Sequence, residues 1–441
     1  MTTFQPQPAG LPSGSFGGRR AAAGGAWQWR RLLAAPHRLA FWSGSVMLAV
    51  SALWWGAVLV ARHAGLAVPW AVSPSVAHAL LMTFGFLPLF IAGFLLTAGP
   101  KWLGLAAVPG RLLALPATLS LGGWALALAG FHGSRPFAAL GLALAALGFA
   151  LVTGLFALMV LESRARDRDH AQLALAGCAA VVGAQWAAAV LLVLGQETAV
   201  RAVVAAVLWA GPGLVFVAVA HRMIPFFTQG ALPAVAAWRP RALLGLLALL
   251  MVLQAPFAAA EVMAGGSLPA APAALRAALE LPGGALLLWL SLRWGLRESL
   301  RVRLLAMLHL GFFWLGVAFT LAGVSHALTS LTAGQPGGAL SLGLAPLHAF
   351  TMGFFGSLLL AMATRVARGH SGRPLLADPW VWLIFWALQV AVLARVGAAL
   401  WPAAGTPLTL LAAQLWLAAV GAWALRHAPW FGRARVDGGA G

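Results

Sequence analysis

The sequence predicts an all-α polytopic membrane protein, a bundle of about twelve transmembrane helices. Of its 441 residues, 62% are hydrophobic and only 8% are charged, and the mean hydropathy is +0.90. Soluble domains keep about a quarter of their residues charged, so this chain has too few polar groups to cover a surface in water. Apolar runs of about twenty residues recur throughout, each long enough to cross a hydrocarbon core about 30 Å thick. The loops between them are short, which leaves no room for a separate soluble domain.

The chain divides into three predicted segments. Residues 1–35 are rich in Pro, Gly, Ala and Arg and are expected to form a flexible cytoplasmic arm. Residues 36–428 form the membrane domain, in which no convincing internal repeat is visible, and residues 429–441 form a short cytoplasmic tail. The predicted spans are residues 39–61, 76–99, 112–131, 137–160, 172–194, 203–224, 241–260, 275–292, 304–330, 341–364, 379–400 and 405–425.

Basic residues are distributed unevenly between the two sides of this plan. An even number of spans puts both termini on one side, and that side collects most of the 28 basic residues. The opposite loops hold only Arg62, Arg135, Arg201 and Arg276. Basic residues mark cytoplasmic loops, so both termini are expected in the cytoplasm. The formal charge of +19 is therefore a topology signal, and no nucleic-acid partner is expected.

Three scarce residue types limit the chemistry. The single cysteine, Cys178, excludes a disulfide within the chain, and without a C-x-x-C-H motif no covalent haem attachment is expected. The chain has no tyrosine, which disfavours oxygen reduction with a tyrosine donor but leaves one-electron chemistry on nitric oxide open. Carboxylates such as Glu261 and Glu280 are predicted at helix ends, so a proton pump built on buried carboxylates is not expected.

Seven histidines fall at two depths in the predicted bundle. His309 and His326 lie on one predicted span, about 25 Å apart along its axis, so they cannot share a metal ion. His370 follows the tenth span, in RVARGHSGRPL (residues 365–375). There Gly369 or Gly372 can end the helix with positive φ, and His370 is expected to fold back toward His221 and His309. The outer layer holds His78, His326 and His348, and the inner layer holds His37, His221, His309 and His370.

Histidines at matched depth are candidate metal ligands. Two imidazoles on facing helices can hold a haem iron from both sides, and His78 and His348 have that arrangement available. Three converging imidazoles would suit copper. Alternatively, each histidine hydrogen-bonds a neighbouring helix. Arg395, near the outer end of its span, either extends to the headgroups or pairs with a haem propionate. The histidines at loops or helix ends, which we expect to be structural, are His63, His132, His170 and His427.

Several stretches, in order, resemble the NnrS family between about residues 36 and 427. The family consists of twelve-span membrane proteins of denitrifying and related bacteria, containing haem and copper and linked to nitric oxide and nitrosative stress. The stretches are PHRLAFW (36–42), HALLMTFGFLPLFIAGFLLTAGPKW (78–102), AHRMIPFFT (220–228), MLHLGFFWLG (307–316) and LHAFTMGFFGSLLLAMATRVARGHSGRPL (347–375).

The resemblance implies haem b as a cofactor and copper as a second candidate. The second helix of the family often reads H-x-H-E, whereas this chain has Leu80 and Leu81 at the last two positions, which weakens the expectation of copper more than that of haem. The implied location is the bacterial inner membrane, with the lipid bilayer, nitric oxide and a small electron donor as partners. The recurring histidines of the family correspond to His37, His78, His221, His309, His348 and His370.

The favoured function is haem-based nitric oxide metabolism or nitrosative-stress defence, of which a nitric oxide-reacting oxidoreductase is one form. Two alternatives stay open: a transporter of a metal or small molecule, and an electron-transfer or assembly partner of a terminal reductase. Haem content separates the transporter from the other two. Nitric oxide consumption by the pure protein separates the oxidoreductase from the partner protein.

Overall fold

A computed structural model describes residues 25–335 and 338–439, so most of the predicted N-terminal arm lies outside the described residues. Within these ranges the chain forms helices and no strands. Twelve helices are long and apolar enough to cross a membrane, and they confirm the predicted membrane bundle. The short helix α1 (Trp29–Leu32) precedes them, and α12 (Leu296–Ser299) lies between the eighth and ninth spans.

Seven spans are single helices and five contain more than one helical segment. The single helices are α2 (Pro36–His63), α6 (Arg135–Glu162), α7 (Asp169–Val193), α10 (Arg241–Met263), α11 (Ala270–Arg293), α13 (Arg303–Thr332) and α16 (Pro379–Leu400). The third span joins the short 3₁₀ helix η2 (Gly110–Leu113) and α5 (Ala114–Gly133). The second span joins α3 (Pro74–Leu80), η1 (Leu81–Gly85) and α4 (Leu87–Leu103), and the sixth span joins α8 (Glu197–Leu208), η3 (Trp209–Gly213) and α9 (Leu214–Ala231). The tenth span joins α14 (Ala345–His348), η4 (Ala349–Gly356) and α15 (Ser357–His370). The twelfth span joins η5 (Pro402–Ala404) and α17 (Gly405–Phe431).

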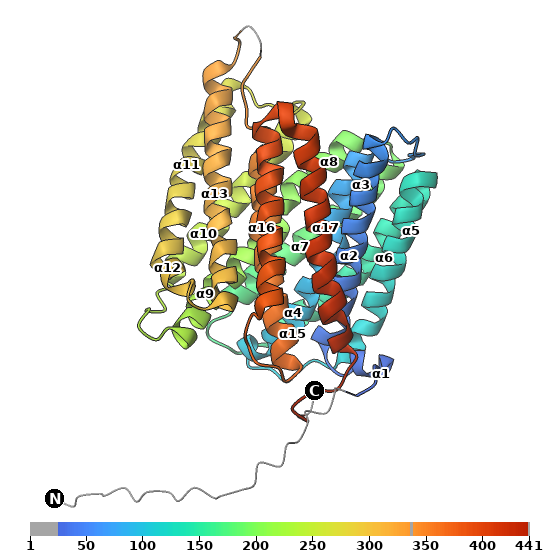
Figure 1. Cartoon of the computed structure of the whole chain (residues 1–441), viewed down its shortest axis with the longest axis vertical. Helices are drawn as coiled ribbons and strands as arrows, with labels where there is room; N and C mark the ends of the chain where they lie inside the picture. Colours follow the sequence, from blue (N-terminus) through green and yellow to red (C-terminus); the bar gives the residue numbers. More distant parts are fainter. Residues whose placement is uncertain (1–24, 336–337, 440–441) are drawn as a thin grey trace, which may run out of the picture.

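The spans run as a bundle of long helices (Figure 1), with α1 and the C-terminal end of α17 at the same end. This is the arrangement that an even number of spans requires. At the tenth span, α15 ends at His370, and Gly372 has the positive φ of 74° that the sequence analysis assigns to one of two glycines. Gly372 therefore turns the chain away from the tenth span.

Three spans at the centre of the bundle contain a π-helical segment. They are the second, sixth and tenth spans, with η1, η3 and η4, so the feature recurs at every fourth span. They are also the most buried spans: 83%, 72% and 72% of their apolar windows lie inside the protein. A π segment inserts one extra residue per turn and is frequent at functional sites. The three central spans carry four of the seven candidate histidines.

Close helix contacts depend on small residues. A Cβ added at Gly130 of α5 would come within 2.2 Å of the Ala138 backbone nitrogen in α6, and one at Gly284 of α11 within 2.9 Å of the Thr320 nitrogen in α13. Membrane helices have no hydrophobic force between them, so backbone contact through small residues supplies much of the packing.

Candidate functional site

Two histidines of the predicted outer layer lie in the same region as a half-buried arginine. His78 lies on α3 and His348 ends α14, each shortly before a π segment. The two imidazoles lie within electrostatic range of each other, and the Arg395 guanidinium from α16 is in range of both. All three side chains are half-buried. The three residues considered as haem contacts in the sequence therefore lie in one region of the bundle.

Neighbouring groups fix the orientation of both rings. His348 donates its Nδ1–H to the Leu344 carbonyl oxygen over 2.9 Å, which leaves the lone pair on Nε2. A backbone carbonyl on one imidazole nitrogen is the usual partner of a metal-binding histidine, because it sets the tautomer. The His78 ring stacks on Trp55 with 4.0 Å between centroids, and its buried Nδ1 has no hydrogen-bond partner.

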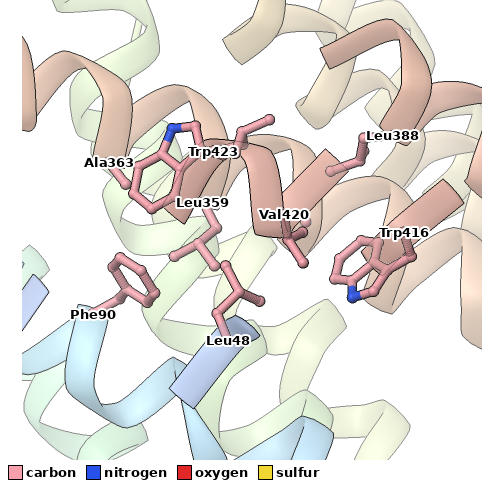
Figure 2. Close-up of a pocket in the computed structure, with 10 residues that line it drawn as sticks. Leu48, Phe90, Leu359, Ala363, Leu388, Trp416, Val420 and Trp423 are labelled. Atoms are coloured by element: carbon pink, nitrogen blue, oxygen red, sulfur yellow. The ribbon is translucent and has the colours of Figure 1, made fainter. Parts of the chain in front are cut away.

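Two apolar cavities lie deeper along the same spans. The first has a volume of about 10 Å³ and lies among the first, second, tenth, eleventh and twelfth spans. Figure 2 shows Leu48, Phe90, Leu359 and Trp423 around this space. The second, of about 60 Å³, shares Phe90 and Leu359 and extends to Phe216 of the sixth span. Both are lined by aliphatic and aromatic side chains, and their volumes match one to a few water-sized molecules.

At the inner end, His370 meets His37. Their ring centroids lie 3.9 Å apart at an interplanar angle of 34°. His37 is buried, and its Nδ1 has no partner. From the sequence we expect His370 to fold back toward His221 and His309. The structure corrects this, since the tenth span ends beside the start of α2.

His221 pairs instead with His170, which the sequence analysis treats as structural. His170 Nε2 and His221 Nδ1 lie 3.0 Å apart, and His221 Nε2 lies 3.2 Å from the Pro240 carbonyl oxygen. Both nitrogens of His221 are therefore engaged, and neither is free for a metal. His170 begins the fifth span at the inner end, the depth predicted for His221. Because His170 and His221 lie at the same depth, the sequence could have predicted that they pair.

His309 contacts the sixth span through Thr228. The two side chains lie 2.8 Å apart, and Thr228 gives its own hydroxyl hydrogen to the Ile224 carbonyl oxygen. His309 Nε2 must therefore donate to Thr228 Oγ1, and the lone pair is on Nδ1. His309 is 1% exposed and joins α13 to α9.

His326 belongs to a group of buried charges that we call the charge cluster, made of Gln254, Glu261, Arg276, Glu280 and His326. His326 Nδ1 lies 2.6 Å from a Glu280 oxygen, and His326 Nε2 lies 3.6 Å from a Glu261 oxygen. Arg276 contacts Glu261 at 2.6 Å, Glu280 at 3.0 Å and the Gln254 oxygen at 3.0 Å.

The charge cluster corrects two expectations. Glu280 does not lie at a helix end: it occupies the middle of α11 and is 1% exposed. Arg276, assigned to an outer loop, lies within the same helix and is also buried. His326 shares the outer depth with His78 and His348, but both of its nitrogens face carboxylates.

The candidate metal ligands form pairs and no larger groups among the described residues. Within residues 25–335 and 338–439, no group of three or more His, Cys, Asp or Glu side chains has an arrangement that could hold a metal ion. The described chain therefore contains no site of three converging imidazoles. His427, also treated as structural, is fully buried and stacks on Trp423 with 4.8 Å between centroids.

Asp378 joins three spans at the inner end. It caps α16 by accepting the Val381 N–H over 3.1 Å, and it pairs with Arg426 at 2.5 Å and with Arg368. Burial alone would raise the pKa of the Asp378 carboxyl, but the Val381 N–H and the two guanidinium groups hold that pKa below its ordinary value.

The comparison with protein families covers nearly the whole chain. The family model described as NnrS protein matches residues 31–435, which include all twelve spans and every site residue discussed above. Among proteins with curated annotation, none matches the chain.

Proposed function

The chain belongs to the NnrS family, and on that premise we propose that it is a haem-binding membrane protein of nitric oxide metabolism or nitrosative-stress defence. The observation that carries the proposal is that His78 and His348, from two central spans, lie within electrostatic range of each other and of Arg395. Ionisable groups inside a membrane bundle are costly and usually mark function.

The residues present fit a b-type haem. His348 offers Nε2 because Leu344 holds its Nδ1–H, and His78 has a buried nitrogen without a partner. Arg395 would pair with a propionate, a charge-assisted contact that orients the ring edge. Trp55 holds the His78 ring by stacking. When bound, the haem supplies one-electron chemistry at its iron.

Copper is the second metal in this proposal, at the inner end. Of the inner histidines, His37 and His370 fit best, since their rings are adjacent and His37 has a buried nitrogen without a partner. Imidazole nitrogen is a suitable copper ligand. His221 does not fit as it is placed, because both of its nitrogens are engaged.

Nitric oxide fits the apolar cavities, since a small uncharged diatomic partitions into hydrocarbon. Phe90 lines both cavities and would be in contact with a gas in either. We propose that the end of the bundle holding α1 and the end of α17 faces the cytoplasm of a bacterial inner membrane, because most basic residues gather there. A small electron donor would supply the reducing equivalents.

One observation favours the transporter alternative. The second, sixth and tenth spans are interrupted by π segments, and interrupted helices at the centre of a bundle are common in transporters. Metal content decides between the two functions, because a transporter needs no resident haem.

The proposal is tested on the purified full-length chain. We expect a b-type reduced-minus-oxidised visible spectrum, a shift of that spectrum when nitric oxide is added anaerobically, and nitric oxide consumption with a chemical reductant. A colourless protein after expression with ample haem would contradict the haem assignment. A haem signal without any nitric oxide shift would contradict the nitric oxide role and favour electron transfer.

A further inference from the structure

The hydrogen bonds of His221 determine where the protons of the histidine pair lie. The Pro240 carbonyl oxygen can only accept, so His221 Nε2 carries the hydrogen of their 3.2 Å contact. Neutral His221 then has its lone pair on Nδ1, which accepts from His170 Nε2 over 3.0 Å. His170, if neutral, therefore has its remaining lone pair on Nδ1.

That lone pair faces another acceptor. His170 Nδ1 is buried, has no hydrogen-bond partner and lies 3.9 Å from Asp167 Oδ1. Asp167 Oδ1 is also buried without a partner. The His170 residue as a whole is 5% exposed. Two unpartnered acceptors aimed at each other are unfavourable, because neither recovers the hydrogen bonds it loses from water. A positive centre between the two atoms would satisfy both.

We propose that His170 and Asp167 bind a first-row divalent transition-metal ion of the zinc type at the inner end of the fifth span. Zinc binds imidazole nitrogen and carboxylate oxygen at about 2.0–2.2 Å in tetrahedral geometry, so two of its donor atoms lie about 3.3–3.5 Å apart. The two atoms are 3.9 Å apart here, and a small rotation of the half-exposed Asp167 side chain brings them to that distance. Water completes the coordination, since the Asp167 side chain is 45% exposed and gives access from the inner end.

His221 is a positioning residue for this site. By accepting from His170 Nε2 it sets the tautomer that presents Nδ1 to the metal, as outer partners do in known metal sites. The proposed zinc site shares no residue with the proposed copper position at His37 and His370. The zinc proposal does not depend on the proposed haem.

Nearby arginines leave the metal-facing oxygen free. Arg222 lies 3.6 Å from the other Asp167 oxygen, Oδ2, and Arg241 lies 3.5 Å from Asp169. These four charges balance. Arg239 adds one further positive charge, so we expect this site to bind zinc more weakly than a closed site of four protein ligands.

The test measures zinc on the full-length protein in detergent. The protein is stripped with chelator, loaded with zinc chloride and gel-filtered, and bound zinc is measured by mass spectrometry. We expect His170→Ala and Asp167→Asn each to bind one zinc equivalent fewer than wild type. Asp169→Asn is the matched carboxylate control and His63→Ala, at an exposed position, the matched histidine control. Both should bind as much zinc as wild type.

Asp167→Asn keeps the proposal falsifiable if His170→Ala fails to fold, because its side chain keeps the same shape at a half-exposed position. Folding is checked by gel-filtration profile and thermal midpoint. If Asp167→Asn folds and binds as much zinc as wild type, the proposal is overturned. A wild-type protein that binds no zinc after loading overturns it as well, and would leave the space to a water molecule or a proton.

Discussion

Replacing Glu280 with Gln removes one buried charge from the charge cluster. In the native protein this carboxylate accepts from His326 Nδ1 at 2.6 Å and from Arg276 Nε at 3.0 Å, and it is 1% exposed. A hydrogen bond to a charged group contributes about 1.5–3 kcal/mol net. The oxygen of Gln at position 280 can retain one of the two hydrogen bonds, from His326 or from Arg276. Removing one partner of a buried ion pair costs about 3–5 kcal/mol. Because Arg276 retains its ion pair with Glu261 in this variant, we expect the free energy of unfolding to fall by about 3 kcal/mol, the lower end of that range.

The assay is equilibrium unfolding in mixed detergent, with increasing SDS and helix content followed by circular dichroism. A loss of about 3 kcal/mol lowers the folded-to-unfolded ratio about 100-fold. Glu162→Gln is the matched control, since Glu162 is exposed at the end of α6 and should change stability by less than about 0.5 kcal/mol.

A double variant separates the ion pair from general damage. Arg276→Gln and Glu280→Gln together remove both charges, so the double variant should lose less than the sum of the two single losses. If Glu280→Gln is as stable as Glu162→Gln, the claim that this cluster holds α10, α11 and α13 together is refuted.

Two further perturbations follow from packing and charge. Gly130→Ala should destabilise the bundle by about 1–3 kcal/mol in the same assay, because the added Cβ meets the Ala138 backbone; Gly122→Ala, with nothing within 4 Å, should be neutral, and equal effects would contradict the contact. The lowered pKa of Asp378 means that its ionised form stabilises the fold above the pKa of the unfolded chain, about 3.9, and that this contribution is lost as pH falls through the lower folded pKa. Asp378→Asn should therefore lower the thermal midpoint at pH 7 and should lose less than wild type on acidification, and parallel midpoint curves would count against the linkage.

The number and approximate bounds of the spans could be predicted because both depend on local composition. Apolar length identifies a span, and the alternation of basic residues places its ends. The π segments could not be predicted in the same way. In a span that is apolar on every face, one extra residue in a turn changes no periodic pattern. Pro88 follows η1 and Pro212 lies within η3, but η4 contains no proline, so no residue type identifies all three segments.

Depth predicted which histidines could meet but not which do. His37 and His370 lie at opposite ends of the chain and meet because α2 and α15 pack at one end of the bundle, a packing order that hydropathy does not encode. The ion pair at the centre of the charge cluster can be read from the sequence. Arg276 and Glu280 are four residues apart, so on one helix they share a face as an ion pair.

The central claim is that His78 and His348 hold a haem. Its most direct test is the reduced-minus-oxidised visible spectrum and haem stoichiometry of purified His78→Ala and His348→Ala, beside wild type and His63→Ala, each with and without added imidazole. The account predicts that both site variants lose or shift the b-type signal, that imidazole partly restores it, and that His63→Ala matches wild type. A wild-type spectrum and full haem content in both site variants would contradict the account.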